Sequence, residues 1–172
     1  VYHLFYQNAK PTRADGSYET HWGHFSSKDL FHWKEHPVAL SPGEIWKHCY
    51  SGSSIVFNDK PIAFFTGLND QYSEVPCIAF PEDDKLSHYT HYEYNPIIPN
   101  RPEGLNGAGF RDPYTWVEDG KVFMALSSSI EEGGTILLYS SEDLKSWEYH
   151  GIMHHIALNK EKGEHGALFE CP

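Results

Sequence analysis

The sequence of 172 residues is poor in cysteine and in positive charge. Its three cysteines, Cys49, Cys77 and Cys171, are far apart and form no C-x-x-C pair. This excludes a disulfide framework, although one bridge stays open, and it gives no support for a zinc site. Only 13 Lys and Arg stand against 24 Asp and Glu, so the formal net charge is −11. Without a basic run, nucleic acid and anionic membrane surfaces are poor partners.

Long hydrophobic runs and long helical patterns are also missing. No apolar stretch approaches the roughly 18 residues that span a bilayer, and no long amphipathic helical periodicity is present. A signal-like segment is absent as well, but residues 1–6 begin directly with a strand-like run. We therefore expect a piece of a longer protein, for which a missing signal says nothing about the compartment.

Short runs of Val, Ile, Phe, Tyr and Trp between turn residues are what the sequence has in abundance. Residues 51–67 are typical of two strands around a turn at 58–61, and residues 110–127 of two strands around Glu118-Asp119-Gly120. Asp-Gly between two apolar runs is a strong hairpin signal. Residues 135–141 form a third clear strand, and the predicted fold class is all-β.

Twelve histidines are many for this length. His21 and His24 are three residues apart, and His154 and His155 are adjacent, spacings that a metal site can use. In strands rich in Tyr and Trp, however, histidines more often make hydrogen bonds than ligate a metal. We therefore expect no metal site.

One segment of the sequence is repeated. Ser-Ser-x-Asp-Leu-x-x-Trp occurs at residues 26–33 and again at 140–147, and a weaker copy lies at residues 86–89. The unit of about 57 residues fits four short strands, which is the size of a propeller blade. The motif is then the turn into each blade's outermost strand, with the Asp capping the turn and the aromatic packing on the neighbouring sheet. The approximate blades are residues 1–45, 46–105 and 106–164, with residues 165–172 starting the next.

The phase of the repeat brings ionisable residues together. Ser51, Asp112 and Glu170 lie near the starts of successive blades, where the first strand lines the central channel. An Asp and a Glu at one pocket can hydrolyse a glycosidic bond, since that chemistry needs an acid and a carboxylate. The alternative is a structural ion pair between Arg111 and Asp112 with Glu170 on the surface. The aromatics Trp22, Trp46, Tyr50 and Trp116 suit either sugar stacking or the core.

The sequence resembles glycoside hydrolase family 32, which includes invertases, inulinases, levanases and sucrose-6-phosphate hydrolases. The resemblance covers the whole chain and is carried by these segments: Tyr2-His3-Leu4-Phe5-Tyr6-Gln7, residues 22–33, residues 37–42, Ser51-Gly52-Ser53, Phe110-Arg111-Asp112-Pro113, residues 138–147 and Glu170-Cys171-Pro172. The pair of Arg-Asp-Pro and Glu-Cys-Pro segments is the most specific of these features.

The resemblance implies a five-bladed β-propeller, of which this chain supplies roughly three blades, truncated at both ends. It also implies retaining cleavage of β-fructofuranosidic bonds without a metal or cofactor. By position, Glu170 is the acid/base and Asp112 stabilises the transition state with Arg111 beside it. Gln7, Trp22, Tyr50 and Ser51 would line the fructose site, and the family more often has Phe where Tyr50 stands.

The nucleophile of the family is an Asp in an Asn-Asp-Pro-Asn-Gly motif, which this sequence lacks. We expect that Asp upstream of the chain, so the chain alone should not turn over substrate. A fructosyltransferase on the same scaffold and a non-catalytic sugar-binding propeller stay open as alternatives. Sucrose, sucrose 6-phosphate, inulin and levan are all compatible substrates. We expect a cytoplasmic protein if the enzyme is specific for sucrose 6-phosphate and a secreted one if it is an invertase or a fructanase. The oligomeric state is open.

Overall fold

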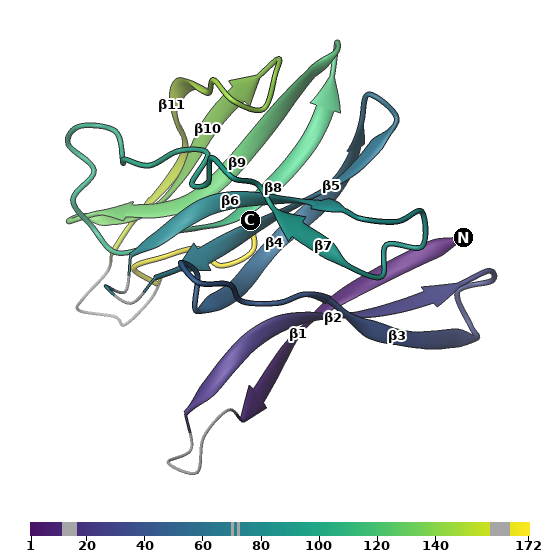
Figure 1. Ribbon diagram of the computed structural model, residues 1–172. Helices are drawn as coiled ribbons and strands as arrows, with labels where there is room; N and C mark the ends of the chain where they lie inside the picture. The colour runs from purple at the N-terminus through teal and green to yellow at the C-terminus, as the bar shows by residue number, and fades with distance from the viewer. Residues whose placement is uncertain (12–16, 70, 72, 159–165) are drawn as a thin grey trace.

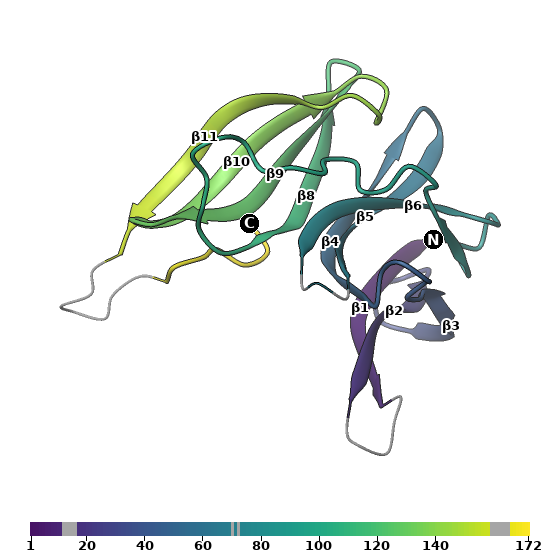
Figure 2. The same ribbon diagram turned by 60° about the vertical axis from the view of Figure 1, so that its left-hand side comes forward.

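The computed structural model describes residues 1–11, 17–69, 71, 73–158 and 166–172. These residues form eleven strands in three antiparallel sheets, and none of them is helical. The sheets follow one another along the chain and lie as three successive layers (Figures 1 and 2). This confirms the predicted all-β propeller architecture. The blade boundaries at residues 45, 105 and 164 stay a prediction.

The first sheet has three strands and the other two have four. In the first sheet, the order is β1 (Tyr2–Pro11), β2 (Tyr18–Ser27) and β3 (Trp33–Leu40). The second sheet contains β4 (His48–Phe57), β5 (Lys60–Leu68), β6 (Glu74–Pro81) and β7 (Tyr89–His91). The third contains β8 (Phe110–Glu118), β9 (Lys121–Ile130), β10 (Gly133–Ser141) and β11 (Glu148–Ala157). Within each sheet, strands that are adjacent in sequence are adjacent in space.

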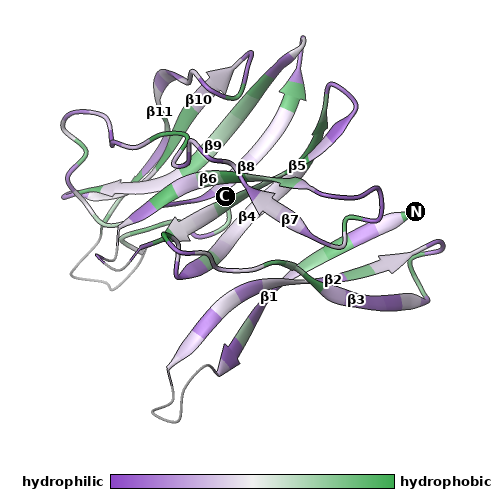
Figure 3. Ribbon diagram, viewed as in Figure 1, coloured by the Kyte–Doolittle hydropathy of each residue, from purple (hydrophilic) through white to green (hydrophobic). Residues whose placement is uncertain are grey.

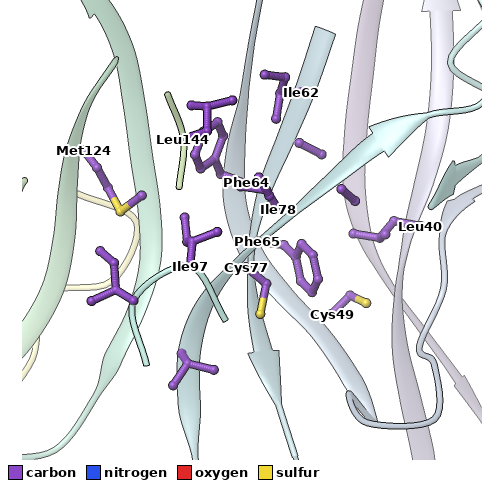
Figure 4. Packing of buried hydrophobic residues seen from close by; sticks show 14 of the residues in the cluster. Leu40, Cys49, Ile62, Phe64, Phe65, Cys77, Ile78, Ile97, Met124 and Leu144 are labelled. Carbon is purple, nitrogen blue, oxygen red and sulfur yellow. The ribbon is translucent and has the colours of Figure 1, made fainter. Parts of the chain in front are cut away.

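The core lies on both faces of the second sheet. Seven consecutive residues of β5 are buried, which follows from the position of this sheet between the other two. Phe64 lies on the side of Met124 in the third sheet, whereas Phe65 lies on the side of Leu40 in the first (Figure 4). Outer strands are more polar, and β3 is largely hydrophilic (Figure 3). Strands in which both faces are covered carry continuous apolar runs rather than alternation.

The repeated motif forms the turn into the outermost strand, as predicted. In the β10–β11 turn, the Ser141 hydroxyl accepts the N–H of Leu144 at 2.8 Å, and Asp143 Oδ1 accepts the N–H of Lys145 and of Ser146, each at 2.8 Å. In the β2–β3 turn, Ser27 and Asp29 bond the corresponding N–H groups. The leucines of both turns have a positive φ, 66° at Leu30 and 65° at Leu144.

The turn aromatics pack on the preceding sheet. Trp147, after β10, lies edge-on against Phe64 of the second sheet, with ring centroids 6.1 Å apart. Tyr89, at the start of β7, lies edge-on against Phe5 of the first sheet at 5.8 Å. The same position in the first sheet is Trp33, which is 39% exposed. The aromatics of the second and third sheets therefore link each of these sheets to the one before it.

Three histidine rings are stacked across the first sheet. His24 of β2 lies between His3 of β1, at 5.1 Å, and His36 of β3, at 4.5 Å. His24 is fully buried, and its Nε2 lies 2.9 Å from His3 Nδ1, whereas its Nδ1 has no partner among the described residues. Burial, followed by the neighbouring His36 and His3, lowers the pKa of His24 to about 4. His24 is therefore neutral at pH 7.

Candidate active site

Two of the predicted site residues lie at equivalent irregularities of two inner strands. In the second sheet, Tyr50 pairs with Thr66 and Gly52 with Phe65, so Ser51 has no partner in the register. In the third sheet, the register shifts in the same way just after Arg111, at Asp112. The backbone of Asp112 has a φ of 56°. Such bulges redirect a side chain out of the strand's alternation and are frequent beside active sites.

Arg111 is the centre of a cluster of charged residues, which we call the Arg111 cluster. Its Nη1 donates to Glu74 Oε1 at 2.9 Å, and its Nη2 donates to Glu170 Oε1. Its Nε is 3.7 Å from Asp112 Oδ2 and makes no hydrogen bond among the described residues. Three carboxylates from three segments of the chain therefore share one guanidinium, a group whose planar fork of donors suits carboxylates.

Asp112 is the buried member of this cluster. Asp112 is 6% exposed, and its Oδ2 accepts a hydrogen bond from the N–H of Cys171 at 3.1 Å. Its own N–H donates to Thr66 Oγ1 at 2.7 Å. Burial raises the pKa of the Asp112 carboxyl above its usual value, and the charges of Glu170 and Glu74 act in the same direction. The hydrogen bond from Cys171 and the charge of Arg111 oppose that rise.

Glu170 is the exposed member, with 69% of its side chain accessible. It lies in a segment that matches the start of β8, since Phe169-Glu170-Cys171-Pro172 repeats the order of Phe110-Arg111-Asp112-Pro113. The residue before proline has a positive φ in both segments, 50° at Cys171 and 56° at Asp112. Glu170 therefore corresponds in position to Arg111. The alternative of a structural ion pair with a surface Glu170 is present in part. Arg111 and Asp112 do form an ion pair and Glu170 is exposed, but Arg111 also pairs with Glu170.

The remaining predicted residues lie beside a pocket of about 380 Å³ next to this cluster. Gln7, Trp22, Ser51 and Cys171 are among its lining residues. Ser51 Oγ donates to Gln7 Oε1 at 3.5 Å, and the Trp22 indole N–H donates to the Tyr50 carbonyl at 2.9 Å. Trp22 is only 6% exposed, so most of its ring belongs to the core.

Tyr50 lies outside the lining of that pocket and contributes to an aromatic row. Its ring is 5.2 Å from His48, which in turn lies edge-on to Tyr18 at 5.6 Å. Burial, with the neighbouring Tyr18 and Glu74, raises the pKa of Tyr50. The Tyr50 hydroxyl is therefore close enough to Glu74 of the Arg111 cluster to feel its charge.

Two of the aromatic candidates lie elsewhere. Trp46 is 5% exposed and lines a separate hollow of about 660 Å³ between the β3–β4 connection and β7. Trp116 stacks on Phe123 at 5.6 Å near the β8–β9 turn. Neither residue belongs to the Arg111 cluster, whose members are Glu74, Asp112 and Glu170 around Arg111.

Sequence reasoning missed Glu74 and Thr66. Glu74 begins β6 and has no counterpart in the repeat, so no pattern marks it. Thr66 lies in the strand predicted from residues 51–67, and it faces Tyr50 across that hairpin. The strand was recognisable, but only the register with its bulge shows that Thr66 reaches Asp112.

The described residues also show how the cysteines and the possible metal ligands are placed. Among the described residues, no group of three His, Cys, Asp or Glu side chains could hold a metal ion. Cys49, Cys77 and Cys171 are free thiols. Over the same part of the chain, no helix is long and apolar enough to cross a membrane.

Comparison with known proteins places this geometry in context. The model of the glycosyl hydrolases family 32 N-terminal domain matches residues 1–172. Sucrose-6-phosphate hydrolase of Klebsiella pneumoniae is 35% identical over 99% of this chain and 36% of its own length. Fructan 6-exohydrolase of Beta vulgaris is 33% identical over 100% of this chain and 29% of its own length.

Solved structures agree with the sequence comparison. Fructan 1-exohydrolase IIa from Cichorium intybus, in complex with 1-kestose, superposes with a TM-score of 0.81 at 28% identity, covering 99% of this chain and 32% of that structure. The Bombyx mori β-fructofuranosidase superposes with a TM-score of 0.79 at 33% identity, covering 99% and 35%. The chain thus spans about a third of the length of these relatives.

Proposed function

Because the chain belongs to glycosyl hydrolase family 32, we propose that it forms part of the catalytic domain of a retaining β-fructofuranosidase. The substrate class is sucrose, its 6-phosphate or a fructan, which are the compounds named for its relatives and for a complex of the Bombyx mori enzyme. The observation that carries the proposal is the Arg111 cluster, in which a buried and an exposed carboxylate are joined through one guanidinium and one backbone N–H. A sugar-binding module would have no need of the exposed carboxylate as an acid.

Glu170 is the general acid/base in this proposal. Its exposed carboxyl is accessible to the oxygen that links fructose to the leaving sugar. It donates a proton to that oxygen as the bond to the anomeric carbon breaks, and a nucleophilic carboxylate then holds the fructosyl group as an ester. Glu170 next takes a proton from water, whose oxygen attacks the anomeric carbon and releases the nucleophile. The nucleophile is an Asp outside residues 1–172.

Asp112 and Arg111 prepare the site for the fructose unit. The buried carboxylate of Asp112 accepts hydrogen bonds from fructose hydroxyls, and these bonds strengthen as positive charge develops on the ring. Arg111 fixes the direction of Glu170 and balances part of the negative charge. Gln7, Trp22, Tyr50 and Ser51 form the walls around the fructose ring, of which Gln7, Trp22 and Ser51 line the adjoining pocket.

The test is release of free fructose by the full-length protein from sucrose, sucrose 6-phosphate, inulin and levan. A Glu170→Gln variant should lose about 10³-fold in kcat, a typical magnitude for general acid catalysis. The loss in kcat/KM should be much smaller with a nitrophenyl β-fructofuranoside, since a nitrophenolate leaving group needs no proton, whereas kcat should stay low because hydrolysis of the ester still needs Glu170 as the base. Glu35→Gln, which changes an exposed carboxylate on β3, is the control and should stay at the wild-type rate.

Three results would contradict the proposal. Sugar binding without release of fructose would indicate a binding module. Transfer of fructose to a sugar in place of water would indicate a transferase. Full activity of Glu170→Gln would remove Glu170 from the acid/base role.

A further inference from the structure

The hydroxyl of Thr66 lies between the two bulges. Thr66 is fully buried on β5. Its Oγ1 donates to the carbonyl of Ser51 at 3.0 Å and accepts the N–H of Asp112 at 2.7 Å. One hydroxyl thus uses both its donor and its acceptor, the first within its own sheet and the second on the inner strand of the next sheet.

Asp112 needs such a support for its backbone. With a φ of 56°, it adopts the left-handed conformation that residues with a Cβ rarely occupy. A conformation of this kind persists only where the surroundings hold it. Cys171 and Arg111 hold the carboxyl group of Asp112, whereas the hydrogen bond to its N–H comes from Thr66. Without that bond a nearly buried N–H would lack a partner, which is costly.

The same relation occurs one sheet earlier. The serine of the repeated turn aligns the sheets: Ser27 pairs with Tyr2 in the first sheet, and Ser141 pairs with Val122 in the third. Five residues after Tyr2 comes Gln7, and five residues after Val122 comes Ser127. Ser127 faces Arg111 as Thr66 faces Tyr50, so Gln7, Thr66 and Ser127 are equivalent. Gln7 Oε1 accepts the hydroxyl of Ser51, the bulge residue of the following sheet, at 3.5 Å, whereas Thr66 accepts the backbone N–H of Asp112. A polar side chain, on β1 in the first sheet and on β5 in the second, therefore meets the bulge of the following sheet.

We propose that Thr66 is a positioning residue for catalysis, which holds the backbone of Asp112 so that its carboxylate faces the fructose unit. This rests on the role proposed for Asp112. Thr66 touches no substrate and acts only through Asp112. A misplacement of about 1 Å at a catalytic group can cost on the order of 10²-fold in rate, so a bond of this kind has a measurable effect.

Ser53 provides a matched control for a merely structural role. Its hydroxyl also joins β4 to β8, since it donates to the carbonyl of Pro113 at 2.9 Å and accepts the N–H of Thr115 at 2.9 Å. It thus bonds one carbonyl and one N–H, as Thr66 does, and it also lies 2.8 Å from the hydroxyl of Thr115. The N–H that it holds, however, is that of Thr115, three residues beyond Asp112. Loss of the Ser53 hydroxyl should therefore weaken the contact between sheets without turning the Asp112 carboxylate.

The experiment compares three variants of the full-length protein in fructose release. Thr66→Val keeps the shape but removes the hydroxyl, and we expect kcat to fall by about 10²-fold. Thr66→Ser keeps the hydroxyl and should remain within about threefold of the wild type. Ser53→Ala should lower the melting temperature, as Thr66→Val does, yet keep kcat within about threefold. Normal kcat in Thr66→Val, no rescue by serine, or an equal loss in Ser53→Ala would overturn the proposal.

A crystal structure of Thr66→Val gives a readout that needs no activity. The expected result is that Asp112 leaves the positive-φ region and that the 3.1 Å contact between its Oδ2 and the Cys171 N–H is lost. An unchanged Asp112 in that structure would refute the positioning role. If the wild-type protein releases no fructose from any fructoside, the proposed function fails, and the crystal structure still decides whether Thr66 holds Asp112.

Discussion

Acid should weaken the first sheet through His24. This ring is fully buried between His3 and His36, and its Nδ1 has no acceptor among the described residues. A proton on His24 would place a charge beside two other imidazoles and an unpaired N–H in the interior. The side chain of Asp83 acts in the opposite direction and raises the pKa, but the net effect is a pKa of about 4 in the folded chain.

The sign and size of the effect follow from this pKa. The unfolded chain has the ordinary histidine value of 6.5, so between pH 6.5 and 4 the unfolded state binds a proton that the folded state rejects. The stability contribution is complete above pH 6.5 and decreases as the pH falls. One pKa unit corresponds to about 1.4 kcal/mol, so the loss at pH 4.5 has an upper limit near 2.7 kcal/mol. The effective dielectric constant of a protein interior is higher than that of a dry medium, which reduces the loss to about 2 kcal/mol.

The assay is urea unfolding of the full-length protein at pH 7.5 and pH 4.5, followed by tryptophan fluorescence. The variant His24→Phe keeps an aromatic ring in the stack but cannot titrate. We expect it to lose about 2 kcal/mol less than the wild type between the two pH values. His88→Phe, at an exposed histidine, is the control and should behave like the wild type. An equal loss in the wild type and His24→Phe would refute the assignment.

Two further predictions concern packing. A Cβ on Gly52 would lie 1.9 Å from the carbonyl oxygen of Phe64, so Gly52→Ala should leave the protein largely insoluble on expression. Gly43→Ala is the control, because its Cβ would approach a side chain no closer than 3.5 Å. This variant should stay soluble with a melting temperature near that of the wild type. Trp147→Ala removes the ring that packs on Phe64 and should lower the free energy of unfolding by about 3 kcal/mol in urea titration; a change below about 0.5 kcal/mol would show that this contact does not join the sheets.

The repeated turns were the most predictable part of the fold. Ser27 with Asp29 and Ser141 with Asp143 make only local hydrogen bonds, so a few adjacent residues determine the structure. The sheets could be inferred because turn chemistry and apolar runs mark each strand. The charged site was predicted in outline, since the repeat brings Asp112 and Glu170 to comparable places.

The parts that escaped prediction depend on register across sheets. Glu74 meets Arg111 from 37 residues away, and nothing near it in the sequence marks the contact. The bulge at Asp112 directs its N–H to Thr66. A bulge inserts one extra residue into a strand, and no sequence pattern marks its position here. The histidine stack is another case, because His3 and His36 meet His24 only when three strands align.

The turn aromatics have a consequence for the order of synthesis. Tyr89 packs on Phe5 and Trp147 on Phe64, so each aromatic needs a surface made from residues that precede it in the chain. The ribosome releases the N-terminal residues first, and structural units fold as they emerge. When the indole of Trp147 leaves the ribosome, the strand that receives it is already present. These two contacts therefore favour assembly sheet by sheet in the direction of translation, whereas Trp33 of the first sheet finds no earlier sheet among the described residues.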